Sequence, residues 1–270
     1  MTKTGLWIYK FMNPSVPYLS IPAFQDMRFI VAAVSTRIGG GSQNPYHSLN
    51  LGYHVGDAYE SVAENRRRFC SKLAIEVGSL VISQQIHGNT TTVINDSHKG
   101  HGAYGHEDAI SSTDGMITES RGVALAVLTA DCVPVLVVDP LRKAIGIAHA
   151  GWRGALSMIA AKTVLKMRDT FGTEPADCLV ALGPCIGPCC YKAGEDVISQ
   201  FQSAFGPAIC VAKDRLDLQL AVQLQLAGVG VEKSNISSSK LCTACNRDLF
   251  YSYRAEGGRT GRMMSVIMLI

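Results

Sequence analysis

The chain has 270 residues, with 25 Lys and Arg against 22 Asp and Glu and therefore a formal net charge of +3. Hydrophobic residues make up 47% of it, which excludes disordered, collagen-like and low-complexity proteins. The charges are spread along the chain and form no clustered basic face, so we expect no nucleic-acid partner.

The first ten residues and the apolar stretches bear on location. Residues 1–10 contain only a short apolar patch and lack the basic start, apolar run and cleavage site of a secretory signal. The longest apolar stretches, around 123–128 and 133–138, are far shorter than the roughly 20 residues of a membrane helix. We therefore expect a cytoplasmic protein without a membrane partner, whose nine cysteines act as thiols or metal ligands.

Short β-branched segments alternate with segments of helical spacing, which indicates an α/β fold. The predicted strands, in chain order, are 29–36, 79–83, 90–94, 115–118, 123–129, 133–138, 144–149, 178–182 and 265–269. The predicted helices are 61–75, a helix that follows Trp152, covers 155–167 and ends near Phe171, and 195–205. Gly172 can adopt the left-handed cap that ends the second of these helices. No linker or internal repeat marks a boundary, so we predict one domain over residues 1–270.

Segment 216–226 carries conflicting signals. Leucine and valine alternate there with period two, which is typical of a strand. Leu, Gln and Ala are strong helix formers, however, and Asp217 is a suitable N-cap. We predict a helix that ends near Gly228.

Cys132 and His149 each stand at the end of an apolar strand, where α/β proteins place functional groups, and His87 also follows a strand. Two imidazole nitrogens and one thiolate would make a three-ligand zinc site with an open fourth position. Such a site polarises a substrate oxygen. From these residues alone, a buried structural cysteine with two hydrogen-bonded histidines is an equally good interpretation.

A series of motifs from about Ser35 to the C-terminus resembles the YfiH-like family. Among them are Gln85-Ile-His-Gly, Thr129-Ala-Asp-Cys-Val-Pro-Val and His149-Ala-Gly-Trp-Arg-Gly. The family is also labelled polyphenol oxidase, laccase-domain protein, purine nucleoside phosphorylase or peptidoglycan editing factor. The resemblance implies zinc on His87, Cys132 and His149. It also implies a single α/β domain with mixed β-sheets packed between helices, not a cupredoxin sandwich.

The family labels disagree about activity, and the histidines help to decide between them. A multicopper oxidase needs about ten histidines, many of them in His-x-His pairs, whereas this chain has seven and no such pair. We therefore reject laccase chemistry. The resemblance implies instead a zinc enzyme that cleaves adenosine, inosine and methylthioadenosine with phosphate and can deaminate adenosine. Copper could substitute for zinc at a His/Cys site.

Phosphate needs fixed cations, and the planar fork of arginine matches its oxygens. Arg37, Arg153 and Arg254 are the candidates, each with a structural salt bridge as the alternative role. Asn50 and Gln85 are candidates to orient a ribose hydroxyl or a ligand.

Asp131 and Cys132 are the candidate catalytic residues. Asp131 directly precedes a predicted metal ligand, so it could support that ligand or transfer a proton. In a rival hypothesis Cys132 is a thiolate nucleophile activated by His149, as in a cysteine-type amidase acting on peptidoglycan precursors, or the site is that of a metal amidase. A third hypothesis is a nucleoside-binding protein without catalysis.

Two further groups of cysteines and histidines are not predicted to bind a metal. Cys185, Cys189, Cys190, Cys242 and Cys245 contain only one C-x₂-C pair, whereas a zinc ribbon has two, so structural thiols are favoured. The glycine-rich stretch 99–106, with His101 and His106 in it and His98 just before it, is expected to be a mobile, solvated loop.

Overall fold

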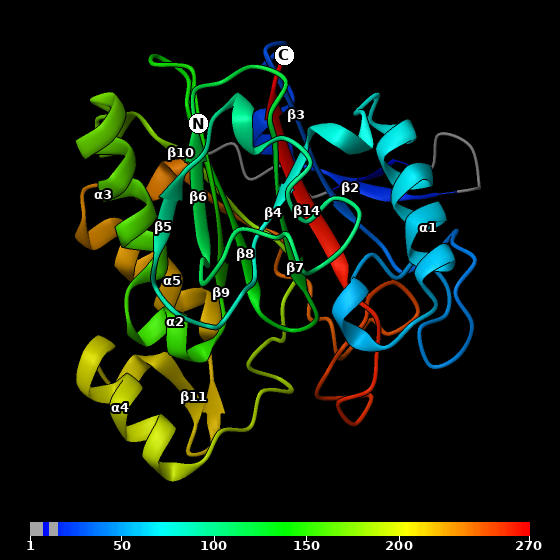
Figure 1. Cartoon of the computed structure of the whole chain (residues 1–270). Coiled ribbons are helices and arrows are strands. Elements are labelled where there is room, and N and C mark those ends of the chain that lie inside the picture. Colours follow the sequence, from blue (N-terminus) through cyan, green and yellow to red (C-terminus); the bar gives the residue numbers. More distant parts are fainter. Residues whose placement is uncertain (1–7, 11–15) are drawn as a thin grey trace.

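The computed structural model describes residues 8–10 and 16–270, and two six-stranded sheets form its centre (Figure 1). The first sheet has the order β1-β2-β3-β14-β7-β4, made of Ile8–Lys10, Tyr18–Ser20, Ile30–Ser35, Met263–Leu269, Ala124–Thr129 and Leu80–Ile82. The second has the order β13-β10-β8-β9-β6-β5, made of Ile236–Ser238, Leu179–Leu182, Val133–Asp139, Ala144–Ala150, Gly115–Thr118 and Thr91–Val93. A separate hairpin joins β11 (Cys210–Ala212) to β12 (Arg215–Leu216). Both large sheets mix parallel and antiparallel pairs.

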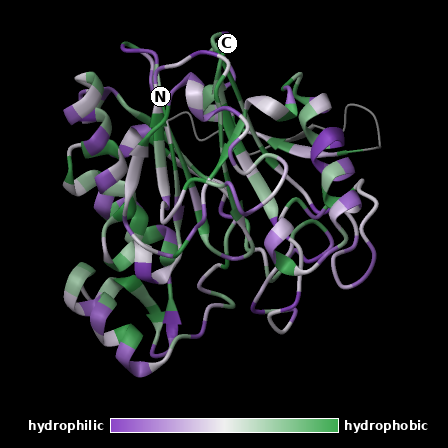
Figure 2. Ribbon diagram, in the orientation of Figure 1, coloured by the Kyte–Doolittle hydropathy of each residue, from purple (hydrophilic) through white to green (hydrophobic). Residues whose placement is uncertain are grey.

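The two sheets pack face to face, and helices cover their outer faces. Strand β8 shows why: Leu136 and Val138 belong to the core between the sheets, whereas Val135 and Val137 belong to the core beneath the helices. Side chains alternate across a strand, so a strand buried on both faces is apolar at nearly every position. This is why the central strands are the most hydrophobic part of the molecule (Figure 2).

Helix α1 (Tyr59–Lys72) covers the first sheet, and α2 (Trp152–Leu156), α3 (Ile159–Phe171) and α5 (Leu218–Gly228) cover the second (Figure 1). Helix α4 (Glu195–Phe205) extends this side beside β11. Short 3₁₀ helices lie at Pro22–Phe24, Tyr53–Val55, Val77–Ser79, Asp96–His98, Pro175–Asp177, Pro207–Ile209 and Lys233–Asn235. Within the described part of the chain, no helix has the length and apolar character needed to cross a membrane.

The predicted fold class is confirmed: mixed sheets lie between helices, and the architecture is not a cupredoxin sandwich. The ambiguous segment is a helix, α5, because the Asp217 carboxylate accepts the Leu220 N–H at 2.9 Å and caps its first turn.

The prediction of a single helix after Trp152 is wrong in one respect. The chain forms two helices, α2 and α3, because Met158 adopts a left-handed conformation with φ of 69° between them. The second helix ends at Phe171 with Gly172 in the left-handed cap, as predicted.

Candidate functional site

The structure brings His87, Cys132 and His149 together. Cys132 directly precedes β8, and His149 lies in β9, opposite Pro134 in the antiparallel register. His87 arrives from the loop after β4, and its ring centroid is 4.8 Å from that of His149. One ligand atom from each of the three residues lies within 4.8 Å of the others. This donor set of two imidazoles and one thiolate fits zinc.

Asp114, which sequence reasoning missed, organises this group from beneath. Its fully buried carboxylate accepts the Nδ1 hydrogen of His149 at 2.8 Å. It also accepts the backbone N–H groups of Ile86, His87 and Gly88 at 3.2, 3.1 and 2.7 Å. The Asp114 carboxylate thus fixes both the loop that carries His87 and the ring of His149. It leaves Nε2 of His149 free to bind a metal.

Cys132 and His149 form a charge pair in the metal-free chain. Burial would raise the pKa of the Cys132 thiol, but the positive charge of His149 and hydrogen bonds from both histidines lower it to about 6. Burial would lower the pKa of His149, but the Cys132 thiolate and Asp114 raise it to about 9. The thiolate, which is the form that binds metals, is therefore available at neutral pH.

The backbone around His87, Cys132 and His149 is tightly constrained. His87 and Asp131 adopt left-handed conformations, with φ of 60° and 91°, a geometry that non-glycine residues adopt only when their surroundings impose it. A Cβ on Gly151 would lie 2.6 Å from Cδ2 of His87 and 3.1 Å from Sγ of Cys132. Only glycine therefore allows the chain to pass so close behind these ligands.

Asp131 has both carboxylate oxygens occupied. Oδ1 accepts the hydroxyl hydrogen of Thr243 at 2.6 Å, and Oδ2 accepts the backbone N–H of Arg254 at 2.7 Å. The carbonyl oxygen of Asp131 accepts the N–H of Ile186 at 2.9 Å. Of the two roles considered for it, this arrangement favours support of the neighbouring Cys132.

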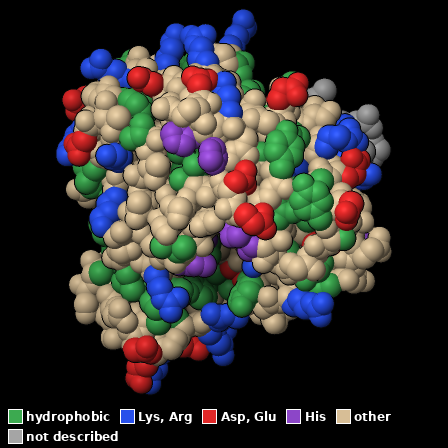
Figure 3. Space-filling model, viewed as in Figure 1, with side chains coloured by type: hydrophobic (Ala, Val, Ile, Leu, Met, Phe, Trp, Pro, Cys, Tyr) green, Lys and Arg blue, Asp and Glu red, His purple; other side chains and the backbone are tan. Residues whose placement is uncertain are grey.

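The side chains of His87, Cys132 and His149 open into a cavity of about 490 Å³, visible as a hollow near histidine side chains below the middle of the face in Figure 3. Its apolar lining includes Leu128, Ala130, Trp152, Ile186 and Leu218. The hydroxyl of Ser83, another residue of the lining, is buried and has no hydrogen-bond partner among the described residues. Burial raises the pKa of the lining residue Tyr191 to about 12, so its hydroxyl stays protonated.

Arginines from three segments line the same cavity. The guanidinium of Arg153 stacks over the Trp152 ring at 4.3 Å and makes no hydrogen bond or ion pair with the described part of the chain. Arg254 donates to the Lys192 carbonyl at 2.6 Å. Arg262, which sequence analysis missed, donates to backbone carbonyls of its own loop. Two of the three predicted arginines are thus at the cavity.

Arg37 is not at the cavity. Its guanidinium binds Glu256 at 2.8 Å and the carbonyls of His47 and Arg247, and it stacks over Tyr251. These contacts correspond to the structural alternative considered for this arginine.

Asn50 also lies outside the cavity, since its buried amide binds Gly52, Asp57 and the N–H of Arg262. Gln85 lines the cavity, but its amide forms a pair of 2.7 Å hydrogen bonds with the backbone of Leu128. Both amides therefore position the chain around the site.

The glycine-rich stretch 99–106 is anchored, contrary to expectation. The buried guanidinium of Arg66 donates to the carbonyls of Gly102 and Ala103, and Gly102 packs against Ile82 so closely that a Cβ would lie 2.8 Å away. His106, at the end of this stretch, lines the cavity. Sequence alone did not reveal this, because the anchoring arginine lies on α1.

The fold and the site define an α/β protein with a two-histidine, one-cysteine centre at the base of an arginine-lined cavity. The family model described as "Multi-copper polyphenol oxidoreductase laccase" matches residues 31–270, and the chain belongs to this family, which confirms the resemblance to YfiH-like proteins.

Named relatives and solved structures support this membership. "Purine nucleoside phosphorylase YlmD" of Geobacillus stearothermophilus is 39% identical over 244 residues, covering 88% of this chain and 89% of the relative. "Purine nucleoside phosphorylase YfiH" of Escherichia coli is 34% identical over 261 residues, which cover 93% of this chain and 99% of the relative. The crystal structure of Bacillus licheniformis "hypothetical protein YfiH" superposes with a TM-score of 0.91 at 35% identity, covering 97% of this chain and 99% of that one.

Proposed function

We propose that this protein is a zinc-dependent purine nucleoside phosphorylase that cleaves adenosine, inosine and methylthioadenosine and can also deaminate adenosine. The observation that carries the proposal is the position of His87, Cys132 and His149 at the base of a cavity that arginines line. The names of the relatives as purine nucleoside phosphorylases support the same reaction class.

Zinc held by His87, Cys132 and His149 would supply Lewis-acid polarisation of a substrate oxygen, which suits both reactions. Asp114 holds the Nδ1 hydrogen of His149, so this ring can bind only through Nε2. Asp131 holds the turn before Cys132 through its contacts with Thr243 and the backbone of Arg254. The chain thereby fixes its ligands before any substrate arrives.

The rest of the cavity offers contacts for each part of a nucleoside and phosphate pair. The indole of Trp152 and the aliphatic side chains of Ile186 and Leu218 provide an apolar wall for a purine. The protonated hydroxyl of Tyr191 can hydrogen-bond to sugar or base.

Arg153 and Arg254 supply the positive charge that binds phosphate and favours its approach to the sugar. The guanidinium of Arg153 is the better placed of the two for this role, because Trp152 holds its plane and its N–H groups have no partner among the described residues, whereas the guanidinium of Arg254 already donates to the Lys192 carbonyl.

The laccase description of the family does not describe this site. Among the described residues, two groups of three or more metal-binding side chains lie close together. One contains two histidines and a cysteine, and the other contains only cysteines. Neither resembles the imidazole-rich clusters that hold several coppers. We expect phenol oxidation to appear only after copper replaces zinc, and robust oxidation by copper-free protein would contradict this.

A cysteine-dependent amidase is the second candidate, and a specific geometry favours it. Cys132, His149 and Asp114 are arranged as a nucleophile, a base and a carboxylate that orients the base. His87 argues for the metal instead, because a second imidazole beside the thiolate is a ligand in a zinc site and has no role in that triad.

The experiment is a product assay on adenosine, inosine and methylthioadenosine, with and without phosphate and a chelator. Base release that requires both phosphate and metal supports the proposal. Replacing His87, Cys132 or His149 by Ala should abolish it and reduce bound zinc while the chain stays folded, because an open site contributes less to folding than a closed one.

The same assay separates the alternatives. Full zinc retention in all three variants would overturn the zinc site. A protein that carries no zinc on His87, Cys132 and His149, is inactivated by thiol alkylation and hydrolyses peptidoglycan precursors would identify the amidase. Nucleoside binding without turnover in either buffer would identify a binding protein.

A further inference from the structure

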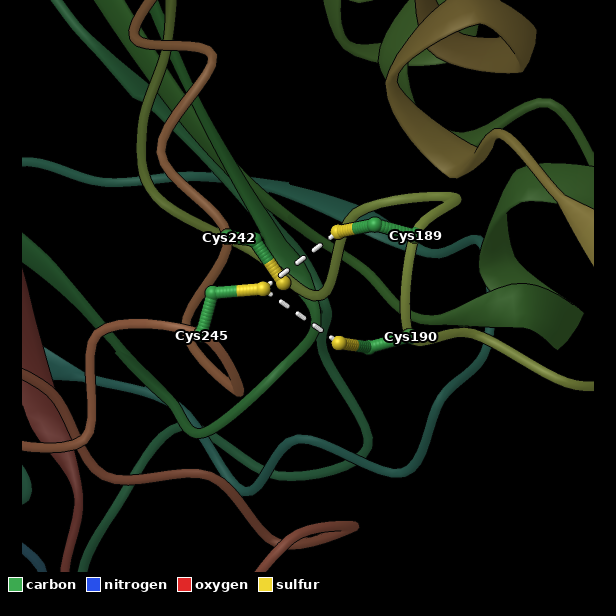
Figure 4. Close-up of side chains that lie close together, drawn as sticks. All are labelled: Cys189, Cys190, Cys242 and Cys245. Atoms are coloured by element: carbon green, nitrogen blue, oxygen red, sulfur yellow. Dashed lines mark hydrogen bonds between the residues drawn. The ribbon is translucent and has the colours of Figure 1, made fainter.

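Four cysteines that the sequence assigned to structural thiols converge at a second place in the molecule. Cys189 and Cys190 lie in the turn before α4, and Cys242 and Cys245 lie in the turn after β13. All four sulfurs point toward one another (Figure 4), and each lies within 4.8 Å of the others. Cys185, the fifth candidate, does not belong to this group. From this geometry we infer that Cys189, Cys190, Cys242 and Cys245 form a closed tetrathiolate site for zinc.

The distances suit a metal better than a disulfide. Sγ of Cys245 lies 3.5 Å from Sγ of Cys189 and 3.4 Å from Sγ of Cys190, so it has no single partner. A disulfide requires about 2.05 Å. In tetrahedral zinc with Zn–S bonds of about 2.3 Å, neighbouring sulfurs lie about 3.8 Å apart. The four sulfurs therefore need only small adjustments to surround one ion.

The backbone around the sulfurs is built to support them. The N–H of Gly187 donates to Sγ of Cys242 at 3.2 Å, a contact typical of the groups that support a metal-bound thiolate. A Cβ on Gly187 would lie 3.4 Å from Sγ of Cys189 and 3.2 Å from Cβ of Cys242, so glycine allows the two turns to approach. Cys189 and Cys245 are exposed, which gives an ion direct access from solvent.

Spacing concealed this site because the two turns are about 50 residues apart. Cys185 pairs with Cys242 in an isolated parallel bridge, and the N–H of Thr243 donates to the carbonyl of Cys185 at 2.9 Å. This bridge brings an adjacent Cys-Cys pair against a C-x₂-C pair. The resulting site would close in the manner of a structural zinc site, with four protein ligands and no open position.

The two turns also contact the residues around the proposed nucleoside cavity. Thr243, next to Cys242, donates to Asp131, and Ile186, three residues before Cys189, lines the cavity and donates its N–H to the Asp131 carbonyl. A metal on the four sulfurs would therefore fasten the two segments that fix Asp131 beside Cys132.

The test counts zinc by elemental analysis in protein purified with reductant, using a Cys132→Ala background so that the cavity does not contribute. We expect one zinc per chain in Cys132→Ala and none after Cys245→Ser or Cys242→Ser is added. Cys210→Ser, at a half-buried cysteine outside the group, should retain the ion. Loss of zinc from the Cys210→Ser control alone, or unchanged zinc in both cluster variants, would overturn the site.

X-ray absorption at the zinc edge of Cys132→Ala provides a readout that does not depend on whether the cluster variants fold. A shell of four sulfurs supports the tetrathiolate, and a mixed nitrogen and sulfur shell refutes it. A zinc-free Cys132→Ala chain two hydrogens lighter than its reduced form would instead identify a disulfide and also refute it. These results do not depend on nucleoside turnover, so failure of the enzymatic proposal would leave them unchanged.

Discussion

Asp114→Asn is the most informative single change, because it alters one atom in a carboxylate that accepts four hydrogen bonds. Asparagine has one acceptor oxygen and one NH₂ group. Its oxygen can serve the N–H groups of Ile86 and Gly88, but the NH₂ group then faces Nδ1 of His149 and the N–H of His87. His149 must accept at Nδ1 and carry its hydrogen on Nε2, which blocks the nitrogen that would bind the metal.

The expected magnitude follows from the loss of one orienting contact at a ligand. Changes to such supporting groups reduce metal affinity by about 10- to 100-fold, which corresponds to about 1.4 to 2.8 kcal/mol. The N–H of His87, left facing the amide NH₂ group without an acceptor, should also lower the free energy of unfolding by about 1 to 3 kcal/mol.

The assay is a zinc competition titration against a chromophoric chelator, with urea denaturation of the metal-free proteins alongside. Asp139→Asn is the matched control. Asp139 is also buried. Its Oδ1 accepts the backbone N–H groups of Leu141 and Arg142, and its Oδ2 has no hydrogen-bond partner within the described chain, so an amide can replace the carboxylate there. If the two variants bind zinc with equal affinity, the reasoning about the His149 tautomer is wrong.

Three further changes test other parts of the site and its support. Gly151→Ala places a Cβ 2.6 Å from the ring of His87 and should weaken zinc binding by about 1 to 3 kcal/mol in the same titration, whereas Gly228→Ala, with nothing within 4 Å, should leave it unchanged. Arg153→Ala should slow phosphorolysis by roughly 10- to 150-fold, from the loss of about 1.5 to 3 kcal/mol, and affect deamination much less; equal factors in the two assays would refute its role with phosphate. Burial raises the pKa of Glu256, but its hydrogen bonds, including that from Arg37, outweigh burial and lower the pKa below 4.5. Its stabilisation is therefore complete well above the ordinary pKa of a glutamate and is lost as pH falls through the lowered pKa, so the loss of unfolding free energy in Glu256→Gln should shrink from pH 7 to acid pH; a constant loss would contradict this.

The elements that sequence predicted best are those whose signal is local. The apolar strands and the 195–205 helix needed only hydrophobic pattern, and α5 followed from its composition and the Asp217 cap. The break between α2 and α3 was missed because it depends on a left-handed methionine, Met158, a conformation that this residue type seldom adopts.

The residues of the site also differ in whether a local sequence signal predicts them. His87, Cys132 and His149 stand in motifs at strand ends, and the resemblance of those motifs to the YfiH-like family predicted them as a group. Asp114 and Arg262 could not, because their roles depend on partners far along the chain: Asp114 meets His149 across two strands, and Arg262 reaches the cavity from the segment before β14. A carboxylate directly before an apolar strand, in Thr113-Asp114-Gly115, was the one available signal.

The hairpin of β8 and β9 has a practical consequence for engineering the protein. Seven residue pairs, from Val133 with Ala150 to Asp139 with Ala144, lock the two strands together. The turn at 140–143 therefore lies about 20 Å from His149 and about 27 Å from Cys132 along the strands, at roughly 3.4 Å per residue, and its Leu141 is 71% exposed. Lengthening that turn leaves the register, and hence the spacing of the two ligands, as it is. A fluorescent peptide tag inserted there would report on the protein without altering the arrangement of Cys132 and His149.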